Sequence, residues 1–399
     1  MREPPPCQLP PRVERLRALM TDQSIDAIVC LKPENTFYLS GFNPIIYSHP
    51  AIVVVTLDHD PILLVFALRG QHARASAWVT DIRLFGTWSD IETLAPDWKE
   101  ALMIILTSLR ASGKTIGLEE GFIPVAQSRN LAEILPQAKF VDVSPFIDQC
   151  RLVKDPDEIK NARIAARIAD VGMDAAFTAL ARAGSTERDV AIASTNAMNQ
   201  YWAENYGDDV EICGFGSLEG GQHNGLAAWV LSGPRKSYAC DNPTTRVPEP
   251  GETVSVFVWT VANGMHAELE RTVCVGPVAE VEQRAIMDIL EIRAKVDARM
   301  RPGIPVSELY EIAKKGFEAK GYGSIIPGRI GHAIGLGPHE NASISATSPV
   351  ILEPGMILTL EPHILIPDVC GTQFSDTILI TETGREYLTR FSRGYLTVN

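Results

Sequence analysis

A nearly repeated phrase is the feature of this chain that most constrains its fold. The sequence reads EPGETVSVF at residues 249–257 and EPGMILTLE at residues 353–361. After a turn, each copy continues into a second apolar segment, ELERTVCV at 268–275 and QFSDTILI at 373–380. Each copy therefore predicts a β-hairpin. The duplication predicts two halves that pack about a pseudo-two-fold axis.

The two hairpins predict one shared pocket. Side chains alternate between the faces of a strand, so Glu268 and Glu270 lie on one face of the first hairpin. Ser375 occupies the matching face of the second hairpin. Phe257 and Glu361 end the two copies of the phrase at equivalent positions. If the halves pack as predicted, the carboxylates of both hairpins face one cavity.

Two domains are predicted from the pattern of helices and strands. Residues 1–152 combine a helix at 12–25 with short apolar strands, which indicates an α/β domain. Residues 153–399 begin with a long helix after Pro156 and combine further helices with the duplicated hairpins. We therefore expect an α+β protein in which a smaller α/β domain precedes a duplicated α+β domain.

Composition excludes several classes of function. The 399-residue chain carries a formal charge of −13, which argues against a nucleic-acid partner because such partners are bound largely through Lys and Arg. Its longest apolar runs are strand-sized and its start shows no signal-peptide pattern, so we expect no membrane partner. The seven widely spaced cysteines favour reduced thiols in a cytoplasm.

A histidine joins the predicted carboxylate cluster. His332 lies in GRIGHAIGLGPHENA, residues 328–342, whose glycines let the backbone approach a ligand closely. Carboxylates a few ångströms apart raise one another's pKa, so a positive charge must lie among them. A metal ion, a cationic group of the substrate or shared protons would each supply it. His223, in the loop EGGQHNG, is a further candidate for the pocket mouth.

Four motifs resemble one known superfamily over nearly the whole chain. They are LVKDPDEI at 152–159, GHAIGLGPHE at 331–340, ILTLEPHI at 357–364 and DTILITETGREYLT at 376–389. Together they resemble the creatinase and aminopeptidase P superfamily. The resemblance implies a creatinase-like N-terminal domain, a C-terminal domain with the pita-bread fold, and a hydrolase that cleaves carbon–nitrogen bonds.

The resemblance also implies a set of metal ligands that this sequence only partly retains. Metallopeptidases of the superfamily hold two divalent ions with five side chains, whose positions here are Phe257, Glu268, His332, Glu361 and Ser375. A phenylalanine and a hydroxyl replace two carboxylates, so we expect no dinuclear centre. One ion held by Glu268, His332 and Glu361 is the alternative, because three oxygen and nitrogen ligands suffice for zinc or manganese.

Other stretches are similar to the metal-free creatinase. DNPTTR at 241–246 resembles its loop with the acid/base histidine, which is Asp241 here, and LERT at 269–272 resembles the stretch with a guanidinium-binding glutamate, here Glu270. The second such glutamate matches Glu361. The leading prediction is therefore a metal-free hydrolase of a small cationic guanidino, cyclic amidine or amide compound. His332 is the preferred proton carrier and Asp241 an orienting group.

The remaining expectations concern the substrate and partners. The resemblance implies a homodimer in which His49 reaches the other subunit's site, and His339 is a candidate substrate contact. The residues expected to bind the carboxylate of creatine have changed, which argues against creatine itself as the substrate. Two functions compete with the leading one, an Xaa-Pro aminopeptidase or dipeptidase with a single ion and a non-catalytic binding protein.

Two carboxylates near the site have alternative roles that involve no ligand. Glu268 has nearby arginines, Arg271 and Arg246, with which it could form an ion pair instead of touching a ligand. Asp376 alternates out of phase with Ser375, so it is expected to face away from the pocket.

Overall fold

The computed structural model describes residues 10–216 and 225–399, which form two compact units. Unit 1 comprises the described residues up to Arg151 together with residues 214–216, and unit 2 comprises the remaining described residues. His223 lies outside the described residues.

Unit 1 is an α/β unit built on one mixed sheet. Its strands are β1 (Ala27–Cys30), β2 (Ile52–Thr56), β3 (Ile62–Phe66), β4 (Asp81–Phe85), β5 (Thr115–Leu118) and β6 (Lys139–Asp142), in the order β4-β3-β2-β1-β5-β6. β1 pairs antiparallel with β2 and parallel with β5. The described helices are α1 (Pro11–Asp22), α2 (Pro33–Tyr38), α3 (Gly70–Ser76), α4 (Trp98–Ser108), α5 (Val125–Ile134) and α6 (Ser144–Leu152).

Unit 2 is built on a larger sheet with four long helices. The helices are α7 (Pro156–Leu180), α8 (Glu187–Asn205), α9 (Glu280–Asp297) and α10 (Val306–Ala319). The strands of the large sheet are β7 (Leu226–Ser232), β8 (Thr253–Ala262), β9 (Met265–Val275), β10 (His332–Ala333), β11 (Glu340–Ser343), β12 (Ile357–Thr359), β15 (Ser375–Ile380), β16 (Arg385–Tyr387) and β17 (Leu396–Val398). β13 (Leu365–Ile366) and β14 (Cys370–Gly371) form a separate ribbon.

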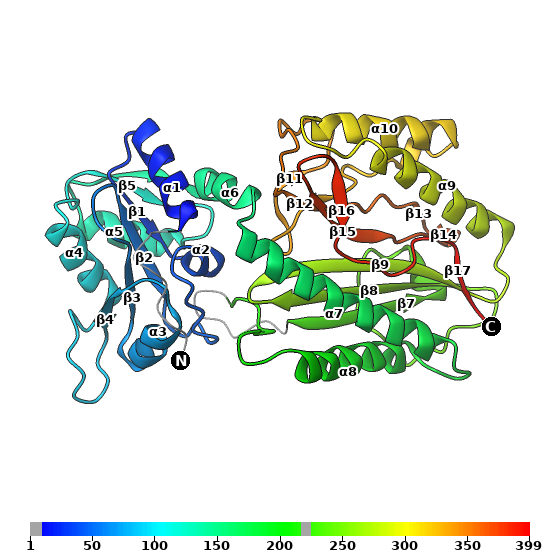
Figure 1. Ribbon diagram of the computed structural model, residues 1–399, viewed down its shortest axis with the longest axis horizontal. Helices are drawn as coiled ribbons and strands as arrows, with labels where there is room; N and C mark the ends of the chain where they lie inside the picture. The colour runs from blue at the N-terminus through cyan, green and yellow to red at the C-terminus, as the bar shows by residue number, and fades with distance from the viewer. Residues whose placement is uncertain (1–9, 217–224) are drawn as a thin grey trace. The chain divides into compact units, whose positions relative to one another are not determined.

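The duplication predicted from the sequence is visible in unit 2. β8 and β9 form the first hairpin, and β12 pairs antiparallel with β15 in the second copy. β9 and β15 pair with each other, so both copies belong to one sheet, whose order is β11-β10-β12-β15-β9-β8-β7. α7 and α8 cover the half with β7, β8 and β9, and α9 and α10 cover the half with β12 and β15 (Figure 1). Each half therefore has its own helix pair and its own hydrophobic core.

The long helices begin where the sequence predicts. Asp155 and Glu158 form a capping box at the start of α7, with Pro156 in its first turn. Thr186 and Asp189 form a second capping box at α8. α9 begins at Glu280 and ends at Asp297.

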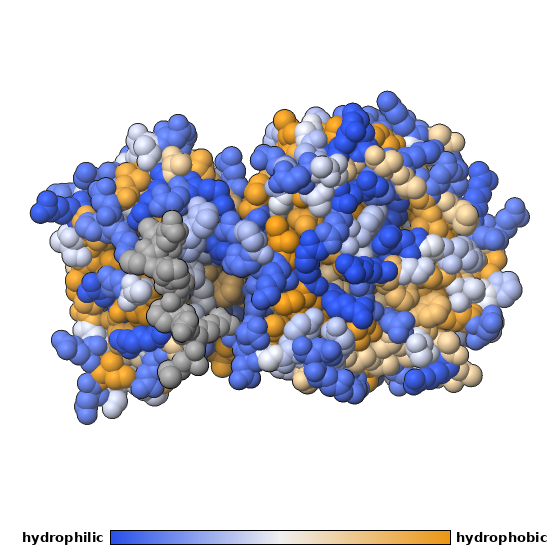
Figure 2. Space-filling model, in the orientation of Figure 1, coloured by the Kyte–Doolittle hydropathy of each residue, from blue (hydrophilic) through white to orange (hydrophobic). Residues whose placement is uncertain are grey.

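The described surface is mixed in character. On the face shown in Figure 2, hydrophilic and hydrophobic residues are interspersed over both units. None of the helices in the described part of the chain has the length and apolar character needed to cross a membrane.

Candidate active site

Strand register brings the predicted hairpin residues together on one face. Glu270 of β9 lies directly opposite Phe257 of β8 and Ser375 of β15. Residues that face each other across antiparallel strands project from the same side of a sheet. Glu268, two residues earlier, projects from that side as well, and its backbone N–H donates to Thr377 Oγ1 over 2.8 Å.

Glu361 reaches the site from just beyond a strand. The sequence predicts a strand that ends at Glu361, but β12 ends at Thr359 and is only three residues long. The chain leaves the sheet there because the Glu361 N–H donates to the Ile330 carbonyl, 2.9 Å away. This bond ties Glu361 to the segment that carries His332. The continued register of β12 on β15 would place Glu361 opposite Ser375, as Phe257 is placed opposite Glu270.

A close backbone approach fixes His332. A Cβ atom at Gly331 would lie 2.2 Å from the Thr359 carbonyl oxygen, so only glycine fits before the histidine. The His332 N–H donates to Thr359 Oγ1 over 3.1 Å. The glycine loop therefore holds the imidazole against β12. The close approach at Gly331 is to the Thr359 backbone, whereas the sequence suggested close approach to a ligand.

His332, Glu268 and Glu361 form a buried cluster. His332 Nε2 lies 3.6 Å from Glu268 Oε2 and 3.5 Å from Glu361 Oε1. His332 Nδ1 donates to the Ala333 carbonyl at 3.0 Å, since that oxygen can only accept. In a neutral ring, Nε2 would then point its lone pair between two carboxylates. Nε2, Glu268 Oε1 and Ser375 Oγ are buried without a hydrogen-bond partner.

The carboxyl groups perturb one another's pKa values. Burial and the charges of Glu268 and Glu361 raise the pKa of Glu270 well above its usual value. Burial and the charge of Glu268 raise the pKa of Glu361 to about 8. Burial opposes ionisation of Glu268, but the facing imidazole outweighs burial and lowers the pKa of Glu268. Burial opposes protonation of His332, but Glu268 and Glu361 raise its pKa. The raised pKa values of Glu270, Glu361 and His332 each reflect the negative charge of neighbouring carboxylates, which an added cation would offset.

The donor set fits one divalent ion. Ligand atoms of Glu268, His332 and Glu361 all lie within 4.8 Å of one another, and the Nε2 atom between them has no other partner. Two carboxylate oxygens and an imidazole nitrogen suit zinc or manganese. Phe257 has no ligand atom and Ser375 offers only a hydroxyl, so the described residues do not provide the bridging carboxylates of a second ion.

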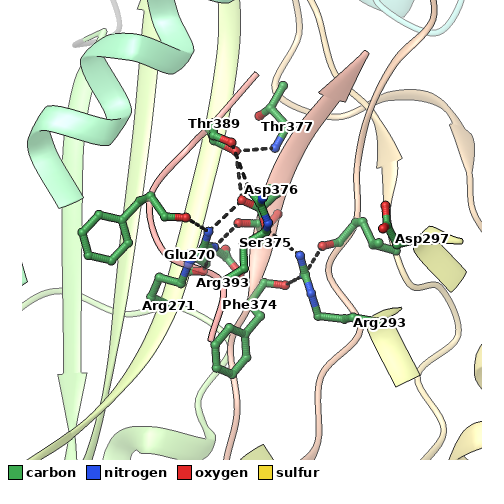
Figure 3. Close-up of polar contacts among 12 residues, drawn as sticks. Glu270, Arg271, Arg293, Asp297, Phe374, Ser375, Asp376, Thr377, Thr389 and Arg393 are labelled. Carbon is green, nitrogen blue, oxygen red and sulfur yellow. Dashed lines mark hydrogen bonds and ion pairs between the residues drawn. The ribbon is translucent and has the colours of Figure 1, made fainter. Parts of the chain in front are cut away.

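A buried charge cluster supports the site strands from the opposite face. Asp376 accepts from Arg271 Nη2 at 2.7 Å, Arg293 Nη2 at 2.6 Å and Thr389 Oγ1 at 3.0 Å (Figure 3). Asp376 is fully buried and pairs with Leu269 in the ladder, which confirms that it is out of phase with Ser375.

The same arginines hold the backbone at the site residues. Arg271 Nη1 donates to the carbonyls of Glu270 and Ser375 over 2.7 and 2.8 Å. Arg293 Nη1 donates to the carbonyls of Leu360 and Phe374, the residues before Glu361 and Ser375. This cluster was not predicted, because nothing in the sequence shows that Arg293 of α9 reaches the sheet.

The ion pairs suggested for Glu268 from the sequence are wrong. Arg271 points to the other face of β9 and binds Asp376. Arg246 binds Glu252 at 2.5 Å. Glu268 therefore faces His332 without competition from either arginine.

Asp241 lies outside the cluster. Its carboxylate is half-exposed, 3.0 Å from Arg235 Nη2, and it accepts from the Asn242 N–H. That backbone bond and Arg235 lower the pKa of Asp241. Arg235 also pairs with buried Glu187, which binds both Ser232 and Thr244. Asp241 is thus part of a network that holds its loop.

The other two candidate histidines in the described chain have different surroundings. The His339 ring lies 4.4 Å from the His332 ring between centroids, so it borders the cluster. Partial burial of the exposed ring and the neighbouring His332 lower the pKa of His339. His49 belongs to unit 1, where its ring stacks on Phe66 at 3.9 Å.

Comparison with known proteins identifies the family. A family model described as Metallopeptidase family M24 matches residues 160–382, more than half of the chain. The chain belongs to metallopeptidase family M24. A second model, Creatinase/Prolidase N-terminal domain, matches residues 12–153 of this M24 protein. Both matches confirm the resemblance to the creatinase and aminopeptidase P superfamily and its two-domain fold.

Relatives of this M24 protein are named as peptidases. An uncharacterized peptidase of Staphylococcus aureus is 25% identical over 96% of this chain and 99% of its own. The prolidase from Pyrococcus furiosus is 25% identical with a TM-score of 0.78, covering 94% of this chain and 100% of its own. The Xaa-Pro dipeptidase from Bacillus anthracis, at 21% identity, shares the fold with a TM-score of 0.81 over 97% and 99% of the two chains. The family supports a hydrolase of carbon–nitrogen bonds.

These relatives bear on the choice between the metal-free site and the single-ion site predicted from the sequence. They give no support to a metal-free, creatinase-like site. The single-ion alternative, in contrast, has its three ligands together.

Proposed function

We propose that this M24 protein hydrolyses a carbon–nitrogen bond in a small cationic nitrogenous compound, an amide, amidine or guanidino compound, at a site for one divalent ion. The observation that carries the proposal is the position of His332 Nε2, buried between Glu268 and Glu361 with no hydrogen-bond partner. Phe257 and Ser375, where the superfamily's metallopeptidases have carboxylates, limit the site to a single ion.

The three clustered side chains would hold the ion. When bound, a zinc or manganese ion polarises the bond to be cleaved and lowers the pKa of water. Glu268 and Glu361 would supply the negative charge, and His332 would supply Nε2 while its Nδ1–H stays bonded to the Ala333 carbonyl. This changes the role of His332 from the proton carrier expected from the sequence to a ligand.

Glu270 would carry the proton. It lies on the same face as Glu268 and is nearly fully buried. In hydrolysis, a water oxygen bonds to the carbon, the carbon–nitrogen bond breaks, and one proton of water must reach the leaving nitrogen. Once a bound cation offsets the charges of Glu268 and Glu361, Glu270 would be ionised, and its carboxylate would accept that proton and release it to the nitrogen.

The names of the relatives favour a second candidate, an Xaa-Pro dipeptidase with the same ion. A substrate panel separates the two. The protein, purified without added metal, is analysed for metal content and assayed against Xaa-Pro dipeptides, guanidino compounds and cyclic amidines. The assay is repeated after treatment with EDTA and after addition of Zn²⁺ or Mn²⁺.

The two candidate functions predict different results in these assays. We expect up to one ion per chain, loss of activity in EDTA, and cleavage of an amidine, guanidino or small amide compound. Cleavage of Xaa-Pro dipeptides alone would favour the second candidate. Full activity of metal-free protein would overturn the single-ion site and return the role of proton carrier to His332.

The proposal also includes a cytoplasmic homodimer. Widely spaced cysteines support the cytoplasm, and the resemblance to the superfamily supports the dimer. Sedimentation velocity of the purified protein tests the dimer, and a monomer at micromolar concentration would contradict it.

A further inference from the structure

Three aromatic rings form a continuous row next to the acidic cluster. Trp229 of β7 lies opposite Phe257, and Trp259 of β8 lies opposite Glu268. Both indoles therefore project from the face that carries Glu268 and Glu270. Ring centroids are 5.7 Å apart between Trp229 and Trp259, and 5.4 Å apart between Trp259 and His339. We call Trp229, Trp259 and His339 the aromatic row.

The row is not part of the core beneath the sheet. The hydrophobic core between α7, α8 and the sheet contains alternate residues of β7 and β8, among them Ala228, Val256 and Val258. Trp229 and Trp259 lie on the other face and are partly exposed. Trp202 of α8 is different, because it packs against that core and donates from Nε1 to the Val210 carbonyl over 2.8 Å.

The row ends at the proposed ion site. His339 is exposed, and its ring lies 4.4 Å from that of His332, which is fully buried. Partly exposed indoles thus adjoin a buried cluster of carboxylates. Aromatic faces attract cations, and tryptophan does so most strongly. Carboxylates nearby add a longer-range attraction for the same charge.

The combination of partly exposed indoles and nearby carboxylates favours a particular kind of cation. A metal ion is held by the oxygen and nitrogen ligands of the cluster and gains little from indole faces. A weakly hydrated organic cation, such as an alkylated ammonium or an amidinium, can lie on the rings while its charge faces Glu270, the carboxylate that does not hold the proposed ion. We propose that Trp229 and Trp259 bind the cationic head of the substrate and determine specificity for it. This inference rests on the proposed function, whose substrate it defines further.

A pair of isosteric probes tests the inference without turnover. Choline carries a trimethylammonium group, and 3,3-dimethylbutan-1-ol carries a neutral tert-butyl group of the same shape. Isothermal titration calorimetry with the metal-loaded protein measures both. We expect choline to bind at least about tenfold more tightly than the neutral probe.

Four variants test which tryptophans contribute to choline binding. Trp259→Leu and Trp229→Leu should each weaken choline binding by about 3–30-fold and change binding of the neutral probe much less. Trp202→Leu, a partly exposed tryptophan of the same unit, should leave choline binding unchanged. Trp259→Phe, which keeps a ring, should recover part of the affinity and covers the case in which a leucine variant does not fold.

The results separate this inference from the proposed function. Equal affinity for both probes, or unchanged choline binding in both leucine variants, would overturn the inference even if a carbon–nitrogen bond is cleaved. Selective choline binding that is lost in the leucine variants would support it, also when no compound of the hydrolysis panel is cleaved.

Discussion

Ser375 and Glu270 lie directly opposite each other where β15 pairs with β9. They come from the two halves of the duplicated domain, and Ser375 stands where the superfamily's metallopeptidases have a bridging carboxylate. The hydroxyl removes a charge at the point where Glu268, Glu270 and Glu361 already raise one another's pKa values or are held by the imidazole.

A carboxylate restored at position 375 should make folding depend on metal. Ser375→Glu adds a fourth acid to a buried cluster, so we expect a loss of about 1–3 kcal/mol of stability in EDTA. Zn²⁺ or Mn²⁺ should reverse the loss, since an ion that binds the folded state stabilises it. Thermal unfolding with and without metal measures both effects. Ser375→Gln, similar in size but neutral, is the control and should show no metal-dependent recovery beyond that of the native protein.

Removal of the imidazole should abolish activity. His332→Ala deletes the one nitrogen ligand of the proposed ion, so metal content should fall and hydrolysis should slow by about 10²–10⁴-fold, comparable to the loss of other essential catalytic groups. Metal analysis and a rate assay check these outcomes, and circular dichroism checks the fold. His59→Ala, on the surface of unit 1, should behave as the native protein. Near-native rates in His332→Ala would exclude His332 from the reaction.

The glycine before His332 should be intolerant of a side chain. Gly331→Ala would bring Cβ to 2.2 Å from the Thr359 carbonyl, and we expect a loss of about 1–3 kcal/mol with displacement of the imidazole. Gly328→Ala is the matched control, since nothing lies within 4 Å of its Cβ position. Urea unfolding compares the two variants. Equal stability would show that β10 can shift away from β12 without cost.

The buried ion cluster should contribute strongly to stability. Asp376→Asn leaves two buried arginines facing a neutral group, and such losses typically cost about 3–5 kcal/mol. Glu386→Gln removes an exposed ion pair with Arg163 and should cost about 1 kcal/mol or less. Denaturant unfolding of both variants gives the comparison. Similar losses would mean that the buried arginines are satisfied by backbone carbonyls alone.

Glu187 should make stability depend on pH. Burial opposes its ionisation, but hydrogen bonds from Thr244 and Ser232 outweigh burial and lower its pKa in the folded state. A lowered pKa gives stability that is present above the unfolded value, about 4.3, and is lost as pH falls through the folded value. Glu187→Gln should therefore be destabilising at pH 7. The difference from the native protein should shrink as the pH falls below about 4.

Urea unfolding across this pH range measures the effect of Glu187. Asp189→Asn, whose carboxylate is exposed and caps the same helix, serves as the comparison for loss of a helix-terminal charge. A difference between Glu187→Gln and the native protein that stays constant down to pH 3.5 would contradict the linkage.

The alternation of side chains between the two faces of a strand was sufficient to predict much of the site. The placement of Glu268 with Glu270, and of Asp376 away from Ser375, follows from the period of two in a strand. The glycine before His332 follows from the need for close backbone approach. These features depend on neighbours in the sequence, so the sequence contains them.

Features that depend on register between distant strands were not predictable. Trp229 and Trp259 join the site only because β7 pairs with β8 in one particular register, which a single sequence does not reveal. The contacts of Arg293 depend on how α9 packs on the sheet. Asp241 was singled out by resemblance, but Arg235 and the Asn242 N–H hold its carboxylate.

The pairing of β9 with β15 has a consequence for biosynthesis. Glu268 and Glu270 are made more than a hundred residues before Ser375, and Glu361 belongs to the later copy. A nascent chain that has completed only the first hairpin holds two of the three acids and neither His332 nor Glu361. The three ligands of the proposed ion would therefore come together only after the second hairpin docks, so the ion could not be bound before the sheet of the duplicated domain is complete.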